Sequence, residues 1–129
     1  MKSARNRRPV ILLLGGVLVL SSCSDMCRNE TVSESVSPDG RYRAVVFTRD
    51  CGATTDYSTQ VSILPASSDT PPRGIGNTFV CAGGDVGVDW TSGGGLMIHC
   101  PSQTRVFKSK TRVRGVDVTY DTGLRSGPS

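Results

Sequence analysis

The sequence predicts an all-β domain: a small antiparallel β-sandwich or open barrel of about six or seven short strands, braced by disulfides. Beyond residue 22, the chain of 129 residues breaks into short stretches rich in β-branched and aromatic residues, with apolar residues at alternate positions. Glycine and proline separate these stretches. No window of about 11 residues there carries the apolar stripe of an amphipathic helix. The length allows a single small domain.

The first 22 residues have the organisation of an export signal. Residues 1–9 are positively charged, and residues 10–20 are an apolar run of 11 residues. This run is too short to cross a bilayer core as a helix, which needs about 20 apolar residues. Two serines then lead to Cys23. We therefore predict a signal peptide over residues 1–22.

The formal net charge of +4 comes from this leader, which contains Lys2, Arg5, Arg7 and Arg8. Without these residues, 11 basic side chains balance 11 acidic ones. Binding to a nucleic-acid backbone needs a clustered surplus of Lys and Arg. We therefore expect no nucleic-acid partner.

Residues 20–23 (LSSC) resemble the lipobox of bacterial lipoproteins, in which the cysteine receives a diacylglyceryl group and becomes the new N-terminus. Two or three acyl chains hold a protein stably on a membrane. The resemblance implies that Cys23 is lipidated and that membrane lipid is a partner. Ser24 after the cysteine favours the outer membrane facing the periplasm, although Asp25 weakens that assignment. The alternative, an ordinary exported protein with a buried Cys23, leaves an odd number of cysteines.

The polar residues 23–36 carry no apolar stripe, so we expect a lipidated tether that lifts the domain off the membrane. Residues 37–40 (SPDG) predict a turn, because Pro38 presets φ and Gly40 accepts positive φ. We place a single β-domain over residues 37–121 and a frayed tail over residues 122–129.

The expected strands follow from alternating apolar residues. Residues 41–49 are apolar on both faces, which suits a central strand. Residues 65–77 hold three Pro and two Gly and predict an irregular loop. The other expected strands are residues 57–64, 78–81, 86–90, 96–100, 106–107 and 112–120. In the last of them a change of parity is explained by a bulge at Gly115.

The side chains expected to point inward form one core, with Trp90 as its largest member. Asp85 and Asp89 should then point outward rather than form an acid–base pair. The predicted core comprises Val46, Val61, Ile63, Val88, Trp90, Ile98, Val116 and Val118.

Four cysteines remain after Cys23, and they allow three pairings into two disulfides. Cys81 and Cys100 share inward parity with their apolar neighbours, and joining Cys27 to Cys51 would fix the tether, so we predict Cys27–Cys51 and Cys81–Cys100. The other pairings are 27–81 with 51–100, and 27–100 with 51–81. The cysteines lack C-x-x-C spacing and His99 is the only histidine, so we expect no metal site.

The densest polar cluster surrounds Cys51, and it is the candidate binding surface: Arg49, Asp50, Thr54 and Thr55. The alternative is that the hydroxyls satisfy loop backbone groups and that Arg49 pairs with Asp50 or a neighbour. A second charged set has even parity, and it predicts either a charged edge strand or a basic stripe for anionic lipid or glycan: Lys108, Lys110, Arg112 and Arg114.

Residues 27–30 (CRNE), 37–40 (SPDG), 49–55 (RDCGATT) and 58–63 (STQVSI) resemble an uncharacterised family of small bacterial envelope lipoproteins. The resemblance covers nearly the whole chain after the leader. It implies an envelope location and a shared fold, and it implies no assigned activity. It also implies that Cys81 and Cys100, which this chain adds to the family pattern, are natural partners.

The expected function is therefore a membrane-anchored, non-catalytic structural or binding module, without a cofactor or catalytic residues, whose partner is an envelope protein or glycan. One alternative is a periplasmic inhibitor of a cell-wall hydrolase. The other is a small envelope enzyme that uses the Cys51 loop. A nucleophilic cysteine needs a base, and His99 beside Cys100 lies on the opposite face of a strand.

Overall fold

The computed structural model describes residues 26–52 and 56–122. The predicted signal peptide, the lipidation site Cys23, and Thr54 and Thr55 of the candidate surface lie outside the described residues, as does the tail from residue 123.

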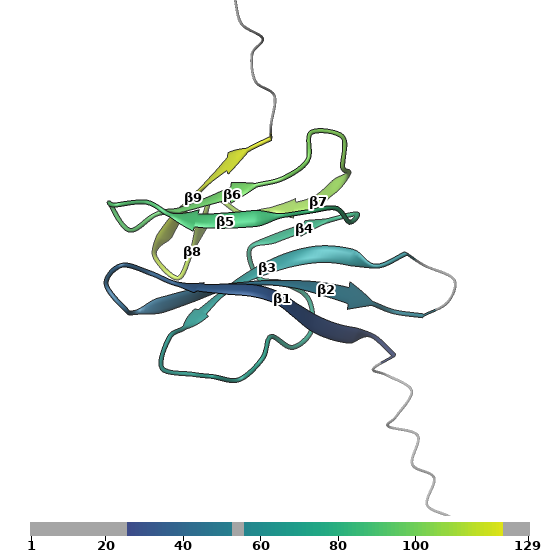
Figure 1. Cartoon of the computed structure of the whole chain (residues 1–129), viewed down its shortest axis with the longest axis horizontal. Coiled ribbons are helices and arrows are strands. Elements are labelled where there is room, and N and C mark those ends of the chain that lie inside the picture. The colour runs from purple at the N-terminus through teal and green to yellow at the C-terminus, as the bar shows by residue number, and fades with distance from the viewer. Residues whose placement is uncertain (1–25, 53–55, 123–129) are drawn as a thin grey trace, which may run out of the picture.

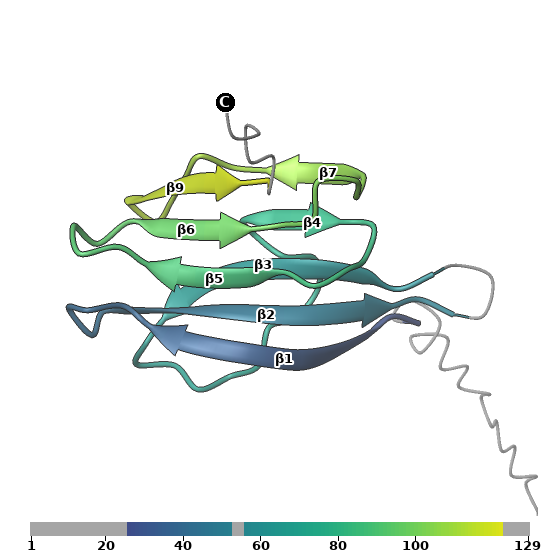
Figure 2. The ribbon, with the colours of Figure 1, turned by 45° about the horizontal axis from the view of Figure 1, so that its top comes forward.

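Two packed sheets make up the described part of the chain, which contains no helix (Figure 1). The five-stranded sheet has the order β1-β2-β3-β4-β7 and the four-stranded sheet has the order β5-β6-β9-β8. Neighbouring strands are antiparallel except β6 and β9, which are parallel (Figure 2). The predicted all-β sandwich is confirmed. The strands are β1 (Arg28–Val36), β2 (Tyr42–Asp50), β3 (Ser58–Pro65), β4 (Phe79–Cys81), β5 (Gly87–Trp90), β6 (Leu96–His99), β7 (Val106–Ser109), β8 (Arg112–Val113) and β9 (Val116–Asp121).

The core lies between the two sheets and contains most of the residues predicted for it. Six of these are buried, namely Val46, Val61, Ile63, Ile98, Val116 and Val118. Val88 and Trp90 are half-buried and pack against this cluster. The Trp90 indole Nε1–H also donates a hydrogen bond of 3.0 Å to the Ser35 carbonyl oxygen. Trp90 thus links β5 of one sheet to β1 of the other.

The outer face of the five-stranded sheet is also buried, because the irregular loop after β3 folds across it (Figure 1). Val45 and Phe47 on this face are fully buried. The Gly76 N–H donates to Gln60 Oε1 at 2.6 Å, and the Asn77 amide bonds both the N–H and the carbonyl of Ile63. A side chain at Gly76 would lie 2.8 Å from the Val61 carbonyl oxygen, so only glycine fits there. The loop is irregular, as predicted, and packs closely against the sheet.

The predicted tether is wrong for residues 28–36, which form the edge strand β1 paired along its length with β2. Only Asn29 and Ser35 of this strand are half-buried, and the other residues are exposed. An edge strand that buries neither face needs no alternation of apolar residues, so its sequence reads like a polar linker. The register also shifts between Thr31 and Ser33, which interrupts any period of two. The β-domain therefore begins before residue 37.

The predicted bulge at Gly115 is a hairpin turn. Arg112 pairs with Asp117, and Val113 pairs with Val116, which leaves Arg114 and Gly115 as a two-residue loop. Both have positive φ, 54° and 81°, as a type I′ turn requires. The apolar residues change parity here because the chain reverses direction between β8 and β9. Together with β1 this reversal raises the number of strands from the predicted six or seven to nine in the described residues.

The SPDG turn is confirmed. The Gly40 N–H donates to the Ser37 carbonyl oxygen at 2.9 Å, and Gly40 has a φ of 74°. The Asp39 carboxylate accepts bonds from the Ser37 hydroxyl and from the Arg41 N–H. Asp39 therefore stabilises the turn.

Replacing Trp90 by Phe should keep an aromatic ring against the core and remove the bond to Ser35. Since one neutral hydrogen bond contributes about 1 kcal/mol, the free energy of unfolding should fall by roughly that amount. Denaturant unfolding measures it, with the exposed Ile75→Ala variant as the control that should leave stability unchanged. Equal stabilities for Trp90→Phe and the wild type would contradict a structural role for the bond.

Candidate functional site

An arginine-lined hollow lies at the end of the five-stranded sheet where the described chain begins. This hollow has a volume of about 400 Å³. It is lined by the residue before β1, by the first residues of β1, by β2 and by the loop after β3. We call it the arginine cleft: Cys27, Arg28, Asn29, Arg49, Pro72, Arg73 and Gly74. Among these described lining residues three are arginines and none is acidic.

A disulfide between Cys27 and Cys51 closes this end of the sheet, as predicted. It joins the residue before β1 to the residue after β2. Asn29 lies directly opposite Arg49 in the ladder between these strands. The disulfide therefore holds the two strands together next to the two side chains that organise the cleft.

The Arg49 guanidinium is held in one orientation. Its Nη1 group donates to Asn29 Oδ1 at 2.8 Å and to the Gly74 carbonyl oxygen at 3.0 Å. The Asn29 amide in turn donates to the carbonyl oxygens of Pro72 at 3.1 Å and Gly74 at 2.9 Å. Asn29, whose role the sequence did not suggest, thus bridges Arg49 to the loop. The Nε and Nη2 donors of Arg49 have no acceptor within the described residues.

The candidate surface predicted around Cys51 is not one cluster. Arg49 points to the outer face of the sheet, whereas its neighbour Asp50 lies on the other face, because successive strand residues alternate. Asp50 lines a separate hollow with Arg28, Glu30, Thr48 and Tyr57, and its carboxylate accepts the Gly52 N–H at 3.1 Å. Arg49 pairs with Asn29, and no Asp50–Arg49 ion pair forms.

The predicted second disulfide is absent: Cys81 and Cys100 are both buried and both free. The Cys81 thiol donates to the Gly83 carbonyl oxygen at 3.6 Å. Burial raises the pKa of the Cys100 thiol, and the neighbouring Cys81 and Asp121 raise it further. The inward parity of both cysteines was correct, but parity does not fix the separation of two sulfurs on facing sheets.

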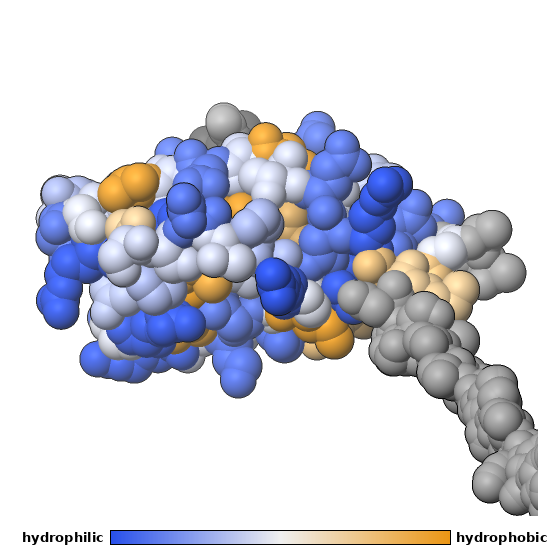
Figure 3. All heavy atoms as spheres, turned by 90° about the horizontal axis from the view of Figure 1, so that it is seen from below, coloured by the Kyte–Doolittle hydropathy of each residue, from blue (hydrophilic) through white to orange (hydrophobic). Residues whose placement is uncertain are grey.

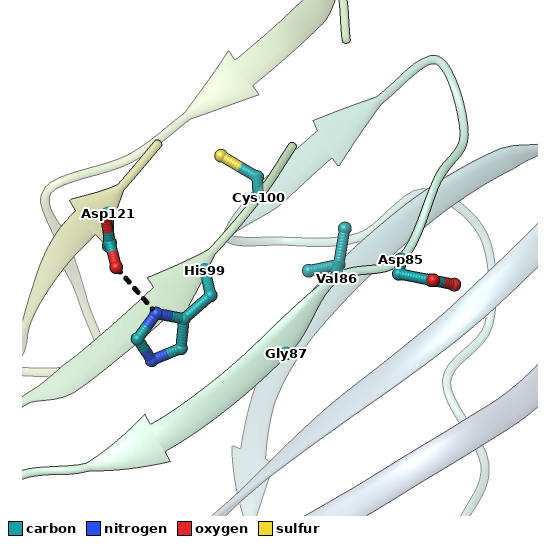
Figure 4. Close-up of a pocket in the computed structure, with 6 residues that line it drawn as sticks. All are labelled: Asp85, Val86, Gly87, His99, Cys100 and Asp121. Atoms are coloured by element: carbon teal, nitrogen blue, oxygen red, sulfur yellow. Dashed lines mark hydrogen bonds and ion pairs between the residues drawn. The ribbon is translucent and has the colours of Figure 1, made fainter. Parts of the chain in front are cut away.

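His99 lies in a second hollow, on the outer face of the four-stranded sheet, with a volume of about 380 Å³ (Figure 4). Both ring nitrogens contact carboxylates: Nε2 lies 2.8 Å from Asp89 Oδ2, and Nδ1 lies 3.1 Å from Asp121 Oδ2. The hydrogen bond with Asp121 contributes most to raising the pKa of His99, the contact with Asp89 adds to it, and partial burial opposes it.

This cluster was not predicted from the sequence. The three residues share odd parity on their strands, but only the pairing of β5 with β6 and of β6 with β9 brings them together.

The Cys100 side chain points away from His99 into the sandwich, as the alternation along a strand predicts (Figure 4). A His–Cys pair for nucleophilic attack needs the two groups within hydrogen-bond reach. Across residues 26–52 and 56–122, no group of three or more His, Cys, Asp or Glu side chains is placed to hold a metal ion.

The even-parity basic residues do not form a continuous stripe. Lys108 lies on β7, at one edge of the five-stranded sheet, and Arg112 lies on β8, at one edge of the four-stranded sheet, so the charged-edge interpretation fits these two residues. Lys110 and Arg114 lie outside the strands. Arg112 pairs with Asp117 at 2.9 Å. Lys108 and Arg114 donate to the carbonyl oxygens of Gly76 and Ile63.

Comparison of this chain with models of protein families, with curated proteins and with solved structures gave no match. The described segments also contain no helix with the length and apolar character that a membrane span needs.

Alkylation of the denatured protein without reductant should label Cys81 and Cys100, and labelling of Cys27 and Cys51 should require reduction. The structural reason is that only Cys27 and Cys51 are bonded. Peptide mapping by mass spectrometry reads the result. Recovery of a Cys81–Cys100 cross-linked peptide would contradict the free thiols.

NMR titration should give His99 a pKa above its ordinary value of 6.5. Asp121→Asn and Asp89→Asn should each lower this pKa, because both carboxylates raise it and the hydrogen bond with Asp121 is the largest single cause. Since the folded-state pKa is the higher one, the stabilisation is complete below about pH 6.5 and is lost as the pH rises through the folded-state pKa. A His99→Gln variant should therefore lose stability relative to wild type in acid and not at alkaline pH. Equal loss at both ends would contradict this assignment.

Proposed function

We propose that this protein is a membrane-anchored, non-catalytic lipoprotein of the bacterial cell envelope that acts as a binding module. The leader over residues 1–22 and the LSSC sequence ending at Cys23 support the anchor. The observation that carries the proposal is that the folded domain begins almost at once after Cys23. The disulfide at Cys27 and the strand β1 from Arg28 leave no long linker between them.

The short connection limits how far the domain can stand from its anchor. Four residues of extended chain span at most about 14 Å, at roughly 3.5 Å per residue. An acylated Cys23 would therefore hold the Cys27–Cys51 end of the sandwich close to the membrane surface. The arginine cleft includes Cys27, so it would be held at this end too.

The scattered apolar residues on the surface of the domain support attachment to the membrane through acyl chains and not through an apolar face of the protein. Figure 3 shows a largely hydrophilic side of the molecule on which apolar residues appear as small separate patches. Surfaces that insert into membranes or bind large apolar partners present contiguous apolar area. The exposed large apolar side chains come from several different elements: Met26, Val32, Val36, Tyr57, Ile75, Val106 and Phe107.

The side chains that could perform catalysis are committed elsewhere, which supports a binding role. Cys51 is in a disulfide, so it is not a nucleophile. Cys100 is buried with a raised pKa, which disfavours the reactive thiolate. Both nitrogens of His99 contact carboxylates, which leaves neither to accept a proton from a substrate or a nucleophile.

Substituting Cys23 by Ser should prevent acylation and release the protein from the membrane fraction or leave it uncleaved with its leader. Intact-mass analysis of the wild-type chain should show a mass that begins at Cys23 and includes acyl groups. Cys81→Ser is the matched control, because it removes a buried free thiol and should leave acylation unchanged. An unmodified Cys23 in the wild type would overturn the proposal.

A further inference from the structure

We propose that the arginine cleft is a binding site for a phosphate group. Arg49 near the end of β2 and Arg73 in the loop after β3 line it from separate segments. Arg28 lies at its edge, because this residue is opposite Asp50 in the β1–β2 ladder and also lines the hollow that contains Glu30 and Asp50. Sequence positions this far apart come together only because the disulfide and the loop close on the same end of the sheet.

Arg49 is the preorganised member of the site. Its Nη1 bonds to Asn29 and Gly74 hold the guanidinium plane, and within the described chain its Nε and Nη2 donors remain unused. This edge of a guanidinium offers two parallel N–H donors that match two oxygens of a phosphate. Because Asn29 and the loop already hold the side chain, little conformational freedom would be lost on binding.

Arg73 supplies further positive charge. It is exposed, and its side chain has no hydrogen-bond or ion-pair partner among the described residues. In contrast, Arg43 on the same strand as Arg49 pairs with Glu34, and Arg112 pairs with Asp117. Glu30 and Asp50, the acidic residues at this end of β1 and β2, lie on the other face of the ladder, in a hollow that Arg28 also lines. No acidic residue is among the described residues that line the cleft, so the charges of Arg49 and Arg73 are not neutralised from within it.

The geometry favours phosphate over a carboxylate. One arginine fork satisfies both oxygens of a carboxylate, whereas a tetrahedral phosphate keeps further oxygens that can accept from a second and a third cation. Arg49 and Arg73, which approach from two segments, fit the second case. The phosphate could be the headgroup of a membrane phospholipid or a soluble phosphate compound. The headgroup source rests on the proposed anchoring of Cys23, which would hold the cleft at the membrane surface.

The test uses the full chain expressed in bacteria and extracted in a neutral detergent. Calorimetric titration with inorganic phosphate, with acetate and with a short-chain phosphatidylglycerol measures each affinity, and NMR of the Arg49 Nε–H reports binding at the site. Arg73→Gln should weaken phosphate binding by about tenfold, the loss expected for one charge-assisted contact. It should not change thermal stability, since Arg73 contacts no other described side chain. Arg41→Gln is the control, because Arg41 precedes β2 at the opposite end of the same strand and carries the same charge.

The titrations test separately whether the cleft binds phosphate and whether that phosphate belongs to a lipid headgroup or to a soluble compound. Tighter binding of phosphatidylglycerol than of phosphate supports the site with a headgroup as its ligand, and the reverse order supports it with a soluble phosphate. Binding of neither overturns the proposal, as does acetate binding as tightly as phosphate, or equal weakening by Arg73→Gln and Arg41→Gln. Intact mass of the same preparation reports acylation of Cys23 independently, so failure of the site and failure of the anchor are distinguishable.

Discussion

The pairing of β1 with β2, closed by the Cys27–Cys51 disulfide, is the constraint on which the rest of this end of the molecule depends. β1 is an edge strand with little burial of its own, so hydrophobic packing contributes little to holding it. The disulfide supplies what packing does not, and the Trp90 bond to Ser35 ties the other half of the strand to the opposite sheet. With β1 in place, Asn29 faces Arg49 and the arginine cleft exists.

The loop after β3 completes the cleft, and polar side chains hold it there. Arg43 is buried on the outer face of β2, where it bonds the carbonyl oxygens of Ser68 and Thr70 and pairs with Glu34 of β1. Gln60 and Asn77 bind the next part of the loop to β3. Buried polar groups are found with hydrogen-bond partners, and here each of the three guanidinium nitrogens of Arg43 donates one bond, which joins β1, β2 and the loop into one unit. The loop therefore covers Phe47 and Val45 and also presents Arg73 beside Arg49.

Most of the sandwich could be predicted from local patterns. Alternation located β2 to β6 within one or two residues and gave the inward faces of Val61, Leu96 and Ile98, because buried strands impose a period of two. β1 was missed because an exposed edge strand imposes no such period. Which residues line the cleft depends on the pairing of strands and on the path of an irregular loop. Neither can be predicted from residues that lie far apart in the sequence. Arg49 was identified as a candidate, but Asn29 and Arg73 required the register of β1 and the loop. The prediction of a Cys81–Cys100 disulfide was wrong for a related reason. Parity along a strand predicts the direction of each cysteine side chain, but not the distance between the two sulfur atoms.

Hydrogen–deuterium exchange at the amides of residues 28–36 tests the central claim most directly. The amides of β1 that donate hydrogen bonds to β2 should be protected from exchange in the oxidised protein. They should lose this protection in a Cys27→Ser/Cys51→Ser variant, while the amides of β3 and β6 stay protected. Exchange throughout residues 28–36 at the rate of a free peptide in the oxidised wild type would contradict the claim. It would show that this segment is a tether and that the arginine cleft has no fixed wall.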